Sequence, residues 1–317
     1  MKNRVILIIL AVGLCFLSVS KVSAEINPQG ASRYVRGLLA IKDDNYELAY
    51  RELERAKRID PESGHIRFKL ASVLLKLKKF DKAEEELQAA KELMPDSLEA
   101  SVALIFLYSS QQDETKLEKE YQYFLEKAHQ LRPENIKISE YLGQFYFYRK
   151  MPQEAIRIYK AIVEQRPDYA EGYFWLGYLH EENGQRQDAI SMWQKALELN
   201  PDHRDSLNSL GYIYAEEGVR LNEAEKLVQK ALKGDPQNGA YLDSLGWIYF
   251  KQGEYEKSEK YLLNALQYLE EPVIYEHLGD VYLALDQKEK ALYYYDKGHS
   301  LYPDDPVLRE RIEKYGK

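Results

Sequence analysis

Proline recurs in this sequence at an almost constant interval. The prolines in question are Pro61, Pro95, Pro133, Pro167, Pro201, Pro236 and Pro303, whose successive intervals are nearly equal except for the last, which is close to twice the others. A period of about 34 residues is typical of arrays in which each unit is one pair of packed helices. The usual scale of about 150 residues per domain does not apply to such arrays, so the repeats must be defined first.

A second mark recurs in phase with the prolines. Leucine is followed by glycine at Leu142-Gly143, Leu176-Gly177, Leu210-Gly211, Leu245-Gly246 and Leu278-Gly279. Small residues allow two helices to approach closely, so we expect paired helices that meet at these positions. Breakers and polar turns at residues 182–184, 251–253 and 286–287 separate the two helices of a pair. No alternating apolar run of strand length follows residue 30, so the predicted fold class is all-α.

These residues resemble the tetratricopeptide repeat, in which a bulky residue, Leu-Gly, Tyr, Ala, an aromatic residue, Ala and Pro stand at fixed offsets. The clearest copy covers residues 170–203 and departs from the pattern only at His180, since it has Tyr173, Leu176, Gly177, Ala189, Trp193, Ala196 and Pro201. The sequences around Trp247 and His277 are similar to repeats of bacterial exported and envelope members of the family.

The resemblance implies a right-handed superhelix, or α-solenoid, over residues 25–305. About eight repeats begin near residues 30, 64, 98, 136, 170, 204, 239 and 272, and residues 306–317 form a capping helix. The third copy has Ile105 where glycine is expected and four inserted residues within 111–116, so we expect its helices to pack less tightly. The first copy has Arg36 at the leucine position, as suits an end repeat with a solvent-facing side.

Residues 1–24 are typical of a secretory signal peptide. Lys2 and Arg4 precede an apolar run over residues 5–19, and residues 22–24 form a small-residue cleavage pattern. We therefore exclude residues 1–24 from the fold. The expected location is the bacterial periplasm or cell envelope.

Cys15 is the only cysteine and lies within the apolar run, so the mature chain would have no disulfide. A lipoprotein acylated at Cys15 is one alternative, although Leu14 is bulkier than the residue usual at that place. An uncleaved N-terminal anchor is the other alternative. Such an anchor is the only membrane association that we expect.

The charge of the chain disfavours nucleic acid as a partner. The sequence has 44 basic and 52 acidic residues, a net charge of −8, and removal of residues 1–24 takes away three basic and no acidic residues, which gives −11. Phosphate contacts need basic side chains, so a chain this acidic is a poor ligand for nucleic acid. A hydrophobic content of 45% is enough for a folded core.

The resemblance also implies where a partner binds. In such arrays the first helix of each pair lines a groove with its second, fifth, ninth and twelfth residues. In the C-terminal half these positions are mainly acidic and aromatic, and the candidate site residues are Glu171, Phe174, Tyr178, Asp205, Asn208, Tyr212, Asp243, Trp247, Phe250, Glu276 and Asp280.

Two interpretations of these residues stay open. In the first, carboxylates hold basic side chains of a protein or peptide client, and Tyr178, Tyr212 and Trp247 act as ring anchors. In the second, the rings pack against the neighbouring repeat and the acids keep the surface soluble. A clamp for a C-terminal carboxylate, known in some relatives, needs lysine and asparagine at these positions and is excluded by the acids.

No catalytic pattern is apparent. The six histidines are scattered, with no more than two in any repeat, without metal-ligand spacing, and there is no Gly-rich phosphate loop or nucleophile elbow. We therefore expect a scaffold or adaptor protein with no enzymatic activity, metal, cofactor or small-molecule substrate. The rival functions are a structural subunit of an envelope assembly complex that uses its outer faces, and a glycan-binding module.

Overall fold

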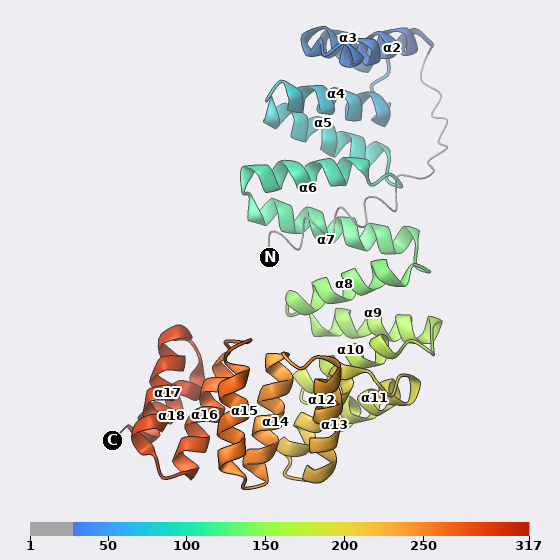
Figure 1. Cartoon of the computed structure of the whole chain (residues 1–317). Helices are drawn as coiled ribbons and strands as arrows, with labels where there is room; N and C mark the ends of the chain where they lie inside the picture. Colours follow the sequence, from blue (N-terminus) through green and yellow to red (C-terminus); the bar gives the residue numbers. More distant parts are fainter. Residues whose placement is uncertain (1–27, 317) are drawn as a thin grey trace. The chain divides into compact units, whose positions relative to one another are not determined.

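The computed structural model describes residues 28–316, and the predicted signal peptide with Cys15 lies outside them. Every regular element in this part of the chain is an α-helix, and consecutive helices pack in pairs (Figure 1). The predicted all-α array of helix pairs is therefore confirmed. Within residues 28–316, none of the helices has the length and apolar character needed to cross a lipid bilayer.

The chain divides between Ile158 and Tyr159 into two compact units. Unit 1 contains the first helices of four pairs, which are α2 (Pro28–Lys42), α4 (Gly64–Lys76), α6 (Glu99–Gln111) and α8 (Ile136–Tyr148). Its second helices are α3 (Tyr46–Ile59), α5 (Phe80–Leu93) and α7 (Glu114–Leu131), and α9 (Pro152–Gln165) spans the division.

Unit 2 contains four complete pairs and one further helix. Its first helices are α10 (Ala170–Glu182), α12 (Arg204–Glu216), α14 (Gly239–Lys251) and α16 (Pro272–Ala284). Its second helices are α11 (Arg186–Leu199), α13 (Leu221–Gly234), α15 (Tyr255–Ala265) and α17 (Lys288–Leu301). Successive first helices contact one another, and α18 (Pro306–Tyr315) packs on α16 and α17 (Figure 1).

The helices of a pair meet where the sequence places glycine. A Cβ atom on Gly177 would lie 2.5 Å from Nε1 of Trp193, and one on Gly279 would lie 2.1 Å from the ring of Tyr295. The same relation joins Gly211 to Val228 and Gly246 to Leu262. Each glycine therefore leaves room for a large side chain of the second helix. The expectation of close contacts at the Leu-Gly positions is confirmed.

Every turn from a first to a second helix contains a residue with left-handed backbone conformation. The φ angles lie between 53° and 80°, at Asp44, Lys78, Gln112, Lys150, Gly184, Gly218, Gly253 and Asp286. A residue in this conformation ends the helix, because it turns the chain away from the helix axis. Backbone N–H groups that follow the helix can then bind its last carbonyl groups. Only three of these residues are glycine, so the recurring feature is the backbone conformation rather than the residue type.

The third pair accommodates its extra residues in the second helix. The helix α7 has 18 residues, whereas α5 and α9 have 14 each. Ile105, at the glycine position, is only 1% exposed. The helices α6 and α7 stay close along less of their length than α4 and α5 do, as the bulky residue at the contact leads us to expect.

Unit 1 contains a ladder of buried ion pairs that the sequence pattern alone did not predict. Glu52, Glu86 and Glu120 recur once per repeat, lie on successive second helices and are 5–8% exposed. Glu86 accepts hydrogen bonds from Lys57 at 2.7 Å and from Arg67 at 3.0 Å. Equivalent bonds join Arg33 to Glu52 at 2.9 Å and Lys91 to Glu120 at 2.7 Å. The ladder ties each second helix to its own pair and to the next.

The ladder is incomplete in the third repeat. Arg33 and Arg67 are the fourth residues of their repeats, and the corresponding residue of the third repeat is Ser101. The hydroxyl of Ser101 and Oε1 of Glu120 are both buried without a hydrogen-bond partner among the described residues. A buried acceptor without a donor costs about 1–3 kcal/mol, so the polar link between the two helices of a pair is lost in the third pair.

We expect Gly177→Ala to destabilise unit 2. Alanine in a helix interior is normally favoured over glycine by about 1 kcal/mol. Here the new Cβ would meet Trp193 at 2.5 Å, and relief of such overpacking costs about 1–3 kcal/mol. Urea unfolding followed by circular dichroism, which reports on the helices of both units, measures the difference. The control is Gly30→Ala in α2, whose new Cβ would lie 3.4 Å from its nearest neighbour. Equal stability of the two variants would contradict the proposed contact.

Candidate partner-binding face

The eleven predicted site residues all lie on α10, α12, α14 and α16, the successive first helices of unit 2. Because neighbouring first helices contact one another, these residues belong to one continuous surface. We call this surface the first-helix face and define it by Glu171, Phe174, Tyr178, Asp205, Asn208, Tyr212, Asp243, Trp247, Phe250, Glu276 and Asp280.

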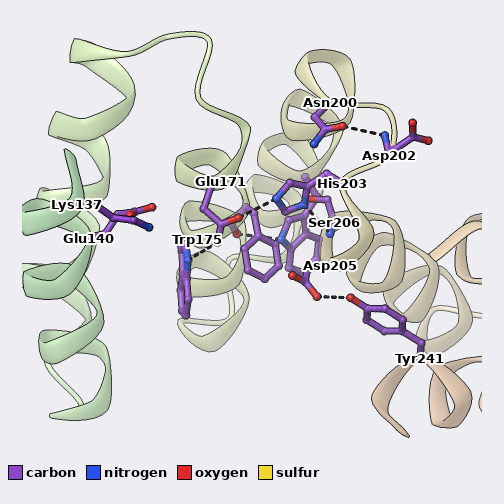
Figure 2. A network of polar contacts seen from close by, with 12 residues as sticks. Lys137, Glu140, Glu171, Trp175, Asn200, Asp202, His203, Asp205, Ser206 and Tyr241 are labelled. Atoms are coloured by element: carbon purple, nitrogen blue, oxygen red, sulfur yellow. Dashed lines mark hydrogen bonds and ion pairs between the residues drawn. The ribbon is translucent and has the colours of Figure 1, made fainter. Parts of the chain in front are cut away.

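Glu171 joins its own helix to the start of the next repeat (Figure 2). Its carboxylate accepts a hydrogen bond from Nε1 of Trp175 at 2.9 Å and lies 3.1 Å from Nε2 of His203. Nδ1 of His203 accepts from the backbone N–H of Ser206 and so caps α12. Since Nδ1 accepts, Nε2 carries the proton and donates it to Glu171. His203 is thus oriented by both repeats.

Asp205 makes a comparable link between α12 and α14. The hydroxyl of Tyr241 donates a short hydrogen bond to the Asp205 carboxylate (Figure 2). Burial raises the pKa of Tyr241, and the bond to Asp205 raises it further, so the hydroxyl stays protonated as the donor. Asp205 is nevertheless exposed, so its carboxylate also faces solvent.

Trp247 packs between repeats. The indole is only 7% exposed, and His277 stacks on it with ring centroids 4.0 Å apart. Phe250 stacks on it at 4.7 Å, and Nε1 donates to Glu216 of α12 at 2.5 Å. A client has little access to this ring. The packing interpretation therefore describes Trp247 better than the anchor interpretation does.

Asp243 and His277 form a buried pair between α14 and α16. Their exposed fractions are 5% and 3%, and Nδ1 of His277 lies 2.9 Å from the Asp243 carboxylate. Burial by itself lowers the pKa of His277, but the attraction and hydrogen bond of Asp243 outweigh it and raise that pKa above its ordinary value. Glu276 and Asp280 add to this effect. The imidazole is therefore held as a cation more readily than a free histidine.

Glu276 and Asp280 bind an arginine of the chain itself. The Arg311 guanidinium of α18 lies 3.1 Å from Glu276 and 2.8 Å from Asp280. Asp280 also accepts a hydrogen bond from the Tyr295 hydroxyl at 2.5 Å. Burial raises the pKa of Glu276 in spite of the arginine. These two carboxylates are occupied by the capping helix.

The contacts at α16 and α18 repeat one geometry. His277 and Arg311 are each the sixth residue of their helix. Each contacts the fifth and ninth residues of the preceding first helix, which are Asp243 and Trp247 in one case and Glu276 and Asp280 in the other. This link, from the sixth residue of one helix to the fifth and ninth residues of the preceding first helix, was not predicted from the sequence. Comparison of equivalent positions in successive repeats would have indicated it.

The remaining residues of the first-helix face are mainly rings. Phe174, Tyr178, Tyr212 and Phe250 are partly buried on α10, α12 and α14. Oδ1 of Asn208 is buried without a hydrogen-bond partner among the described residues. Burial and nearby carboxylates raise the pKa of Tyr212, so its hydroxyl stays neutral.

The first-helix face shows no grouping suited to a metal ion. Among residues 28–316 no set of three or more His, Cys, Asp or Glu side chains is placed to hold a metal. The two histidines beside this face, His203 and His277, are both bound to carboxylates of the chain.

We expect Asp243→Asn to cost more stability at pH 6 than at pH 9. The pKa of His277 is raised by folding, so the stabilisation by Asp243 is present in full below the ordinary histidine pKa of about 6.5 and is lost as the pH rises through the raised value. Urea unfolding at both pH values measures the cost. The control is Asp168→Asn, which removes an exposed carboxylate beside Arg166 and should behave alike at both pH values. A pH-independent cost for Asp243→Asn would mean that His277 is neutral.

Comparisons with known proteins identify the family of the chain. Tetratricopeptide repeat family models match residues 40–113, 142–190, 176–239 and 209–311. No curated protein sequence matches the chain. A thermophilic tetratricopeptide repeat protein of Thermus thermophilus is 21% identical with a TM-score of 0.50, over 57% of this chain and 98% of that one.

Two further solved structures are similar. A tetratricopeptide repeat protein from Parabacteroides merdae is 15% identical with a TM-score of 0.48, over 92% of this chain and 100% of that one. MamA of Desulfovibrio magneticus is 21% identical with a TM-score of 0.44, over 54% of this chain and 97% of that one. The family models together cover most of the chain. It therefore belongs to the tetratricopeptide repeat family, whose folds serve as scaffolds for protein–protein interaction.

Proposed function

We propose that this chain is an exported scaffold or adaptor that holds a segment of a protein partner against the first-helix face of unit 2. The observation that carries the proposal is the row of partly buried rings on successive first helices, Phe174, Tyr178, Tyr212 and Phe250. Aromatic side chains on rigid helices lose little conformational freedom when they bind, which suits them as anchors for a partner.

The carboxylates of the first-helix face divide into two groups in this proposal. Asp243, Glu276 and Asp280 join repeats and keep the face in shape. Glu171, whose side chain is 39% exposed, and Asp205, which is also exposed, join repeats as well but are more accessible to solvent. We assign these two to basic side chains of the client, because a carboxylate accepts several hydrogen bonds at once.

Asn208, which lies on α12, supports the same proposal. Its Oδ1 has no donor among the described residues, and an unpaired buried acceptor is unfavourable. Rotation of the amide would offer it to a backbone N–H of the client. The client would therefore be held by rings, by two outer carboxylates and by one amide.

The location of this activity is part of the proposal. The signal-like residues 1–24 favour export to the periplasm or cell envelope, and acylation at Cys15 or retention of the segment as an anchor would fix the scaffold to a membrane. N-terminal analysis of the protein recovered from fractionated cells distinguishes a chain that begins after residue 24 from an acylated or uncleaved one.

Site-specific crosslinking tests the face. A photoreactive phenylalanine analogue in place of Tyr212 should capture the client in living cells. The matched control is the same analogue in place of Tyr293 on α17, which is 58% exposed and lies outside the first-helix face. Capture from position 293 alone, or equally from both positions, would place the contact on an outer face and refute the proposal.

We expect Tyr212→Ala to weaken binding of the captured client by about 1–3 kcal/mol, which is the usual cost of removing an aromatic anchor. Calorimetric titration of the purified client measures the change, and circular dichroism checks that helicity is retained. Trp247→Ala is unsuitable as a binding test, since this buried ring also supports the packing of α14 on α12 and α16. Unchanged affinity in Tyr212→Ala would remove Tyr212 from the contact.

A further inference from the structure

A second surface feature of unit 2 lies away from the first-helix face. A cavity of about 720 Å³ opens between the start of α12 and the exposed side of α13. Its lining includes four basic side chains, Arg204, Lys226, Lys230 and Lys233, and one acidic side chain, Asp202. Residues 159–317 contain 19 basic and 29 acidic residues. The unit as a whole is therefore acidic, whereas the lining of this cavity is mainly basic.

The three lysines lie along one side of α13. Residues 226, 230 and 233 are separated by four and three positions, which places their side chains on the same helix face. The distance from Lys226 to Lys233 along the helix axis is about 10 Å, at about 1.5 Å per residue. The cavity therefore presents an elongated row of positive charge.

Two of the cations are held in place by the backbone. The Arg204 guanidinium donates to the carbonyl oxygen of Gly234 at 2.9 Å. A Cβ on Gly234 would lie 2.6 Å from Cδ of Arg204, so glycine at this position lets the arginine cross the end of α13. Lys230 donates to the carbonyl oxygen of Pro201 at 2.6 Å and pairs with Asp202 at 2.9 Å.

The other two cations keep their charge uncompensated. Lys226 and Lys233 are exposed, and neither forms an ion pair with a carboxylate in the part of the chain that the structure describes. They stand on either side of Lys230, whose single carboxylate partner, Asp202, is 84% exposed. Like charges held this close repel one another, and a bound anion removes that repulsion. Leu207 adds an apolar wall to the cavity.

We propose that this cavity binds an acidic segment of a protein partner in an extended conformation. In the extended polyproline II conformation the backbone advances about 3.1 Å per residue with three residues per turn, so carboxylates three residues apart lie on the same side and about match the separation of Lys226 and Lys233. A single phosphate group is too small to contact both Lys226 and Lys233, which lie about 10 Å apart along the helix axis. Nucleic acid is disfavoured by the negative charge of the unit, and a flat membrane surface does not enter a cavity between helices.

Fluorescence anisotropy with the full chain tests this surface. The probe is a labelled peptide with glutamate at every third position, and its comparison peptide has glutamine instead. We expect the wild-type chain to prefer the glutamate peptide and to bind it more weakly as salt is added. The double variant Lys226→Gln/Lys233→Gln should lose at least about fivefold in affinity, because both free charges are removed.

A matched pair of exposed lysines controls for net charge. Lys160 and Lys260 lie outside the cavity, so Lys160→Gln/Lys260→Gln should change the affinity by less than about twofold. Circular dichroism confirms that both double variants stay folded. An equal loss in the two double variants, or no preference for the glutamate peptide, would overturn the proposal. Stronger binding to phosphatidylglycerol vesicles or to inorganic phosphate than to the peptide would also overturn it.

Discussion

The structure depends on one close contact, in which a glycine of the first helix receives a large side chain of the second. Gly177 with Trp193 and Gly279 with Tyr295 show it most clearly, since even one added carbon atom would overlap the ring. The contact sets the distance between the helices of a pair, and the left-handed turn residue sets their reversal. Because all pairs of unit 2 share this spacing, their first helices come side by side and form a continuous face. In the third pair, where Ile105 replaces the glycine, the two helices stay together over a shorter length.

Polar bonds then join one pair to the next, and they do so differently in the two units. In unit 1 the ladder built on Glu52, Glu86 and Glu120 runs through the second helices. In unit 2 the bonds of Glu171, Asp205 and Asp243 run between first helices, on the face that we assign to a client. A partner that contacts this face therefore touches the bonds that hold the repeats in register. In the proposed function, binding and the stacking of repeats are coupled through the same carboxylates.

The repeat period predicted the fold well because each pair is a local structure whose signal recurs in the sequence. The candidate site was less predictable, since its outcome depends on residues one full repeat away. Whether Trp247 is open or covered depends on His277, and whether Glu276 and Asp280 are free depends on Arg311. Comparison of equivalent positions across repeats could have found these links, as well as the glutamates that recur once per repeat in unit 1. The cavity beside α13 had no such signal in the sequence, because Arg204 and Lys230 donate to backbone carbonyl groups. Every residue has a backbone carbonyl, so the residue types do not indicate these bonds.

The capping helix α18 has a consequence for how copies of the chain associate. Arg311 takes the place that the sixth residue of a following repeat would occupy, and Leu308 is fully buried beneath the helix. Solenoid proteins can polymerise head to tail when the last repeat leaves its stacking surface open. Here that surface is already covered, whereas Val35 and Leu39 at the opposite end of the described chain are 51% and 56% exposed. A filament could grow through the C-terminal side only after α18 had detached and Arg311 had released both carboxylates.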